Sequence, residues 1–80
     1  MGREPGGSYG DHVTGEEFRA IRDALGLSAS AWGRALGYSG PKANIAVHIR
    51  RLERDGRGIP ASIKRLAVMF KHHGIPKDWL

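Results

Sequence analysis

The sequence has no cysteine, which excludes a disulfide framework and any metal site built from thiolates. No apolar run approaches the roughly 18 residues that a membrane-spanning helix needs. The first residues also lack the apolar stretch of a secretory signal. With 80 residues, the chain has room for one domain with a small core. We therefore expect a small cytoplasmic domain without membrane contact.

Motifs for catalysis and cofactor binding are also lacking. The four histidines do not have the spacing of a metal site, because His72 and His73 are adjacent and face different directions. The glycine pair Gly56-x-Gly58 is not followed by the Lys-Ser/Thr of a phosphate-binding loop. No nucleophile with a neighbouring base stands out, and so short a chain leaves little room for a pocket. We expect no enzymatic activity, no cofactor and no metal.

What the chain does contain is an excess of positive charge, which is unevenly placed. Lysine and arginine number 13 against 8 acidic residues, giving a formal net charge of +5. Residues 1–41 hold four arginines against five acids, whereas residues 42–80 hold nine basic residues against three acids. A one-sided positive surface fits a polyanion, most commonly nucleic acid. A solvated basic surface is the alternative.

Capping residues and hydrophobic spacing predict two short helices in the first half of the chain. Thr14 and Glu17 have the spacing of a capping box, and apolar residues then recur at helical intervals as far as Gly26, a stop signal. Ser28 is a good N-cap for a second helix, which Gly37 ends. Only about two residues separate these helices.

Two further helices are predicted in the second half. The third begins within residues 42–44 and ends near residue 55, with either Asn44 as its N-cap or Pro41 as its first helical residue. The fourth starts at Pro60 and stops at Gly74. No strand pattern is present. The predicted fold is all-α, a compact bundle of four, or at most five, short helices.

The predicted bundle divides the chain into three parts. Residues 1–13 show no periodicity and are expected to form a flexible arm, residues 14–74 the helical domain, and residues 75–80 a C-terminal tail. The tail ends in Trp79 and Leu80, which either fold back onto the bundle or form a dimer patch. Fold-back is favoured because a short bundle needs the extra apolar area.

The third predicted helix has an apolar face and a basic face. Ile45, Ile49 and Leu52 recur at i, i+4 and i+7 and mark the buried side. The opposite side carries Ala43, Val47, Arg50, Arg51 and Arg54. Such a helix fits the major groove of DNA, and the amides at the start of the preceding helix, at Ser28, can hold a phosphate. A plain four-helix domain with a charged surface is the alternative.

Four stretches of the sequence together resemble the lambda-repressor/Cro type of helix-turn-helix domain, the xenobiotic-response-element (XRE) family. They read EFRAIRDALGLS at 17–28, AWGRALGYS at 31–39, IRRLER at 49–54 and GIP at 58–60. The resemblance implies a lambda-repressor-like helix-turn-helix fold. It also implies a sequence-specific DNA-binding regulator, typically a repressor in a bacterium or phage.

The sequence departs from the family pattern in three places. Ala29 stands where the family has a glutamine that usually touches phosphate, and Leu52 replaces an aromatic residue. The stretch 37–53 is also several residues longer than the common form. The extra residues, around 40–47, lengthen the turn or the start of the third helix. The family's base-reading positions therefore transfer to this chain only as a group.

The residues expected to contact DNA follow from this placement. Lys42 and Asn44 lie at the end that enters the groove, where asparagine can read adenine and lysine can reach guanine or phosphate. Helix capping is the alternative role for Asn44. Arg57, in the following loop, resembles a family position near phosphate. The expected DNA-binding set is Ser28, Ser39, Lys42, Ala43, Asn44, Val47, Arg50, Arg51, Arg54 and Arg57.

Three functions are consistent with these observations. The leading interpretation is a small transcriptional regulator that binds double-stranded DNA, with a homodimer on two half-sites as one arrangement. The second is the antitoxin of a toxin–antitoxin pair, whose partner is the toxin. The third is an adaptor that reuses the bundle without binding DNA, as the missing glutamine and the longer turn suggest. A toxin-like neighbouring gene would favour the second, and a duplex titration separates the third from the others.

Overall fold

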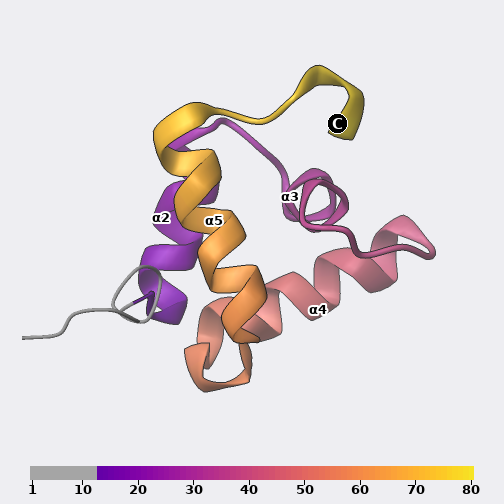
Figure 1. Ribbon diagram of the computed structural model, residues 1–80. Helices are drawn as coiled ribbons and strands as arrows, with labels where there is room; N and C mark the ends of the chain where they lie inside the picture. Colours follow the sequence, from indigo (N-terminus) through magenta and orange to yellow (C-terminus); the bar gives the residue numbers. More distant parts are fainter. Residues whose placement is uncertain (1–12) are drawn as a thin grey trace, which may run out of the picture.

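The computed structural model describes residues 13–80, which form a bundle of four α-helices and two short 3-10 helices (Figure 1). The elements are α2 (Gly15–Ala24), α3 (Ala29–Ala35), α4 (Lys42–Arg54), η1 (Gly56–Gly58), α5 (Ala61–His73) and η2 (Lys77–Trp79). Within this part of the chain there is no strand, so the predicted all-α fold is confirmed. Residues 1–12, most of the predicted arm, lie outside the described residues.

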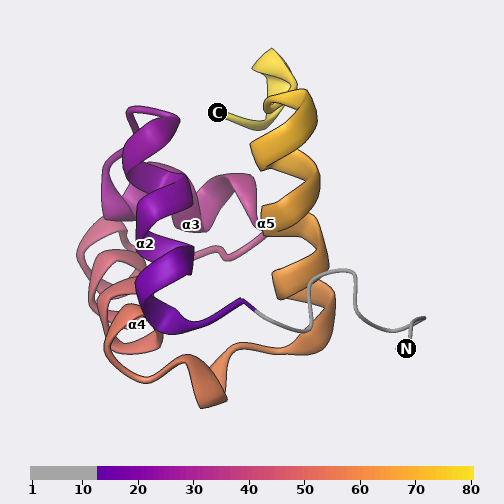
Figure 2. The ribbon, with the colours of Figure 1, turned by 90° about the vertical axis from the view of Figure 1, so that its left-hand side faces the viewer.

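α2 and α5 run roughly side by side, and both α3 and α4 lie across this pair (Figures 1 and 2). In Figure 1, α3 is seen end-on whereas α4 runs across the picture, so these two helices cross at a steep angle. None of the helices in residues 13–80 combines the length and the apolar character needed to cross a bilayer.

Local sequence signals set both ends of α2 and α3. The side-chain oxygen of each predicted N-cap accepts a hydrogen bond from a backbone N–H three residues later, at 3.0 Å for Thr14 and 3.1 Å for Ser28. Each helix ends in a glycine with a left-handed backbone, Gly26 with φ of 73° and Gly37 with φ of 100°. The glycine N–H and the next N–H bond back to carbonyls near the helix end, which completes a Schellman cap.

α4 begins at Lys42, within the predicted range of 42–44, and α5 begins at Ala61, one residue after the predicted start. Pro41 and Pro60 are N-caps with extended backbones, so they precede the first helical residue instead of forming it. The alternative that made Asn44 the N-cap is wrong. Asn44 is the third residue of α4, and its backbone N–H donates to the Pro41 carbonyl at 3.0 Å. The proline carbonyl accepts the first helical bond, which lets the helix begin directly after it.

An aromatic cluster lies at the centre of the core. Phe18, Trp32 and Ile49 are fully buried and come from α2, α3 and α4. The Trp32 ring lies 5.4 Å from the Phe18 ring and 6.1 Å from the Phe70 ring of α5, in tilted and edge-on arrangements. One indole therefore joins three of the four α-helices.

Both ends of the described chain pack against this core. Val13, which the prediction placed in the arm, is buried among the core residues, so the packed part begins one residue earlier. At the other end, the Trp79 ring lies edge-on to Phe70 at 5.6 Å, and the tail returns over α3 (Figure 1). Fold-back describes only part of the tail, because Trp79 remains 48% exposed and Leu80 59%.

The start of α2 meets the end of α4 backbone to backbone at Gly15. A Cβ atom built on Gly15 would collide with the carbonyl of Glu53, and one built on Gly56 would collide with the Gly15 nitrogen. Backbone atoms cannot rotate out of the way as a side chain can. The missing side chains at these two glycines therefore set how closely α2 approaches α4.

Gly15→Ala is expected to lower the free energy of unfolding by about 1–3 kcal/mol, the usual cost of overpacking. This loss runs against helix propensity, which favours alanine over glycine. Gly58→Ala is the matched control, because a Cβ there meets only the Leu52 Cδ2 atom, at 3.4 Å. Urea unfolding of both variants checks the expectation. Equal midpoints for the two would contradict the backbone contact.

Candidate nucleic-acid interface

Close packing at Gly33 holds α4 across α3. A Cβ atom at Gly33 would collide with the Ile45 side chain and come within 3.0 Å of Ile49 Cγ1. The residues between the helices, 36–41, make a turn in which Gly37 and Gly40 have positive φ angles of 100° and 119°. The Tyr38 ring in this turn packs edge-on against His48 of α4 at 4.8 Å. The arrangement is two crossed helices joined by a fixed turn.

The structure confirms the predicted inner face of α4, and its opposite face is exposed. Ile45, Ile49 and Leu52 are buried against α2 and α3. The residues predicted to project the other way are all exposed: Ala43, Val47, Arg50, Arg51 and Arg54. Lys42 and Asn44, at the start of the helix, are exposed as well. α4 therefore presents Ala43, Val47 and its three arginines on one outer face, and Lys42 and Asn44 are exposed at its start.

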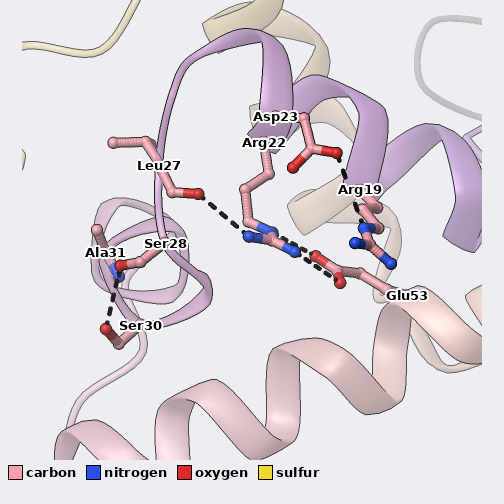
Figure 3. A network of polar contacts seen from close by, with 8 residues as sticks. All are labelled: Arg19, Arg22, Asp23, Leu27, Ser28, Ser30, Ala31 and Glu53. Atoms are coloured by element: carbon pink, nitrogen blue, oxygen red, sulfur yellow. Dashed lines mark hydrogen bonds and ion pairs between the residues drawn. The ribbon is translucent and has the colours of Figure 1, made fainter.

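The only acidic residue of α4 points inward, where Arg22 of α2 neutralises it (Figure 3). Arg22 Nε donates to Glu53 Oε2 at 2.7 Å, and Nη2 donates to Oε1 at 3.2 Å. Only 12% of the Arg22 side chain and 7% of the Glu53 side chain are exposed. The hydrogen bonds to Glu53 raise the pKa of Arg22 above its usual value, against the opposing effect of burial.

The same arginine ties the loop after α2 to this ion pair. Arg22 Nη1 donates to the carbonyl oxygen of Leu27 at 3.1 Å, one residue before the N-cap of α3 (Figure 3). One guanidinium thus fixes α2, the α2–α3 loop and α4 relative to one another. Burying a guanidinium costs much less free energy when it is paired and hydrogen-bonded than when it has no partner.

The outer surface of α4 consequently carries positive charge that no acidic residue in the described part of the chain offsets. Within residues 13–80, no carboxylate lies within ion-pair distance of the four exposed cations of α4, Lys42, Arg50, Arg51 and Arg54. An uncompensated positive surface attracts polyanions and raises their association rate.

An open cleft of about 420 Å³ adjoins this surface between α2 and α4. Its lining residues, which define what we call the arginine cleft, are Arg19, Arg22, Arg50, Glu53 and Arg54. Arg50 and Arg54 belong both to this cleft and to the outer face of α4. The cleft therefore continues the basic surface toward α2.

The remaining predicted DNA contacts lie on other elements. Ser39 is exposed in the turn, and Ser28 is exposed with its Oγ occupied by the α3 cap and 3.3 Å from Ser30 Oγ. Arg57 differs from the arginines of α4, because Asp55 holds its guanidinium through bonds of 3.1 and 3.3 Å. These bonds from Arg57 lower the pKa of Asp55. The charge of Arg57 is thus offset locally.

The sequence alone did not indicate the Arg22–Glu53 pair or the place of Arg19 beside α4. The available signal was weak: Arg22 follows the buried Ile21, and Glu53 follows the buried Leu52, so both lie at the edge of an apolar face. An acid and a base at the edges of two packed faces are candidates for a pair. Nothing local links residues that lie 31 positions apart in the sequence.

Two further comparisons do not identify a function for this surface: a search for metal-binding groups and a comparison with known proteins. Across residues 13–80, histidine, aspartate and glutamate side chains do not gather into groups of three or more that could hold a metal ion. No protein-family model, curated protein or solved structure matches the chain.

Proposed function

We propose that this chain binds double-stranded DNA in a sequence-specific manner, with α4 in the major groove. In this proposal it is a small bacterial or phage transcriptional regulator of the XRE type, a repressor acting in the cytoplasm. One observation carries the proposal. α4 exposes four cations without a carboxylate partner among residues 13–80, three of them arginines on its outer face, while its only acid is neutralised on the inner side.

The dimensions and chemistry of α4 support this proposal. Its 13 residues make a rod about 20 Å long, and the major groove, about 12 Å wide, admits an α-helix. Ala43 and Val47 share the outer face with the arginines. Short apolar side chains permit close approach to base edges and can contact the methyl group of thymine.

The arginines of α4 have different proposed roles. Arg50 or Arg51, nearer the middle of the helix, reads a base, most commonly guanine through a bidentate contact. Arg54, at the last helical position, contacts a phosphate. Arg57 contributes less than the α4 arginines, because binding a phosphate would require it to share or leave Asp55.

Alanine variants of the three α4 arginines test the proposal. Loss of a base-reading arginine is expected to reduce the binding free energy on the preferred site by about 1–3 kcal/mol. It also reduces discrimination between bases at one base pair. Loss of a phosphate-contacting arginine lowers the salt slope of log affinity by roughly 1 on any duplex. Affinity is measured for specific and random duplexes across a salt series, after selection of the specific site from a random pool. Lys77→Ala, in the tail, is the control and is expected to change little.

Two outcomes would contradict this function. Equal losses for all four variants on both duplexes would mean that the chain is a general polyanion binder. If no variant loses affinity for duplex DNA, the DNA-binding proposal is wrong and the adaptor interpretation takes its place. A two-fold symmetric consensus from the random pool would further support a homodimer on paired half-sites.

A further inference from the structure

The charges within the arginine cleft do not cancel. Arg22 and Glu53 neutralise each other at its floor through a bidentate pair. The other three lining side chains, Arg19, Arg50 and Arg54, are guanidiniums. Like charges that share one recess repel each other, and an anion between them relieves that repulsion.

Only one of these three guanidiniums has a carboxylate partner among residues 13–80, and that contact is loose. Arg19 Nε lies 3.8 Å from Asp23 Oδ2, with 65% and 60% of the two side chains exposed. Such an exposed i,i+4 pair contributes little, because solvent screens it. Arg19 can therefore exchange Asp23 for a stronger anion, and charge-assisted hydrogen bonds to phosphate are among the strongest in proteins.

We propose that the arginine cleft binds one backbone phosphate of the bound duplex, between Arg19 of α2 and Arg50 and Arg54 of α4. This inference rests on the proposed function, and it makes Arg50 a phosphate ligand and leaves Arg51 as the base-reading arginine. Arg50 and Arg54 lie four residues apart on one side of α4 and border both the groove-facing surface and the cleft. A strand that flanks the major groove beside α4 passes this opening, so a phosphodiester is the anion that the position favours.

The buried ion pair gives this site its shape. Arg22 and Glu53 link α2 to α4 and hold the helix that carries Arg19 at a fixed place beside α4 (Figure 3). Arg19 is not in the DNA-binding set expected from the sequence. In this proposal it is a phosphate ligand supplied by α2, a helix outside the α3–turn–α4 unit.

The test compares Arg19→Ala with Arg34→Ala, an exposed arginine on α3 that lines a different recess beside the tail. Arg19→Ala is expected to lower the salt slope of log affinity by roughly 1. It is also expected to reduce the affinity for specific and random duplexes by the same factor. Arg34→Ala is expected to match the parent. Thermal melts establish that both exposed-site variants remain folded. If Arg19→Ala also matches the parent while Arg50→Ala loses affinity, the cleft is not a phosphate site and the proposed function stands.

A second measurement separates the cleft from DNA binding as a whole. Inorganic phosphate is titrated into the full chain while the arginine Nε–H signals are followed by NMR. We expect the signals of Arg19, Arg50 and Arg54 to shift together and that of Arg34 to stay. If they shift in a chain that binds no duplex, the proposed function fails and the anion site stands. If Arg19 shifts no more than Arg34, the inference is overturned.

Discussion

Trp32→Ala is expected to lower the free energy of unfolding by about 3–5 kcal/mol, the usual cost of truncating a large buried aromatic residue. Trp32 is fully buried and contacts the rings of Phe18 and Phe70, so its removal opens a cavity between α2, α3 and α5. Small domains have total stabilities of about 5–15 kcal/mol, and one of this size lies toward the lower end. Most of the stability would be lost, as measured by urea unfolding followed by far-UV circular dichroism.

Trp32→Phe is the matched variant. The indole Nε1 of Trp32 is buried and finds no hydrogen-bond acceptor among residues 13–80, so replacing it costs no bond within that part of the chain. A phenyl ring also retains most of the aromatic packing. We expect less than half the loss of the alanine variant. A phenylalanine variant as unstable as the alanine variant would contradict this expectation.

The helix ends were predictable because the interactions that set them are local. Thr14 and Ser28 bond to amides three residues away, and the glycines after α2 and α3 close their caps within five residues. The start of α4 falls within the predicted range of 42–44, and that of α5 within one residue of the prediction, for the same reason. Packing across the chain left no such signal. The burial of Val13 and the contact of Trp79 with Phe70 both depend on the assembled core.

The sequence predicted which face of α4 carries the arginines, but not which of their charges are offset by acidic residues. Hydrophobic spacing alone put Arg50, Arg51 and Arg54 opposite the buried face of α4, and the structure confirms that they are exposed. Which acids offset which bases depends on tertiary contacts. Glu53 is neutralised by a distant arginine, whereas Asp55 neutralises the nearby Arg57. Arg19 escaped notice because its half of the chain has almost no net charge.

Glu53→Ala is expected to lower the free energy of unfolding by about 3 kcal/mol and to weaken duplex binding. Breaking a buried ion pair typically costs about 3–5 kcal/mol, because the remaining charge is left buried without its partner. The lower end applies here, since Arg22 keeps its bond to the Leu27 carbonyl and 12% of its side chain is exposed. The variant also removes one link between α2 and α4, so the arginines on the outer face of α4 are held less firmly in position. Urea unfolding and duplex titration measure the two effects.

A double variant separates the loss of the pair from the loss of stability. Replacing a buried pair by apolar residues of similar volume is often neutral or stabilising, so Arg22→Met with Glu53→Leu is expected to recover most of the loss. The link from Arg22 to the Leu27 carbonyl is absent in that variant. If the pair orients α4 for DNA, the double variant is folded and yet binds duplex more weakly than the parent. Parent-like affinity in the stable double variant would show that the ion pair contributes to folding alone and that core packing suffices to place α4.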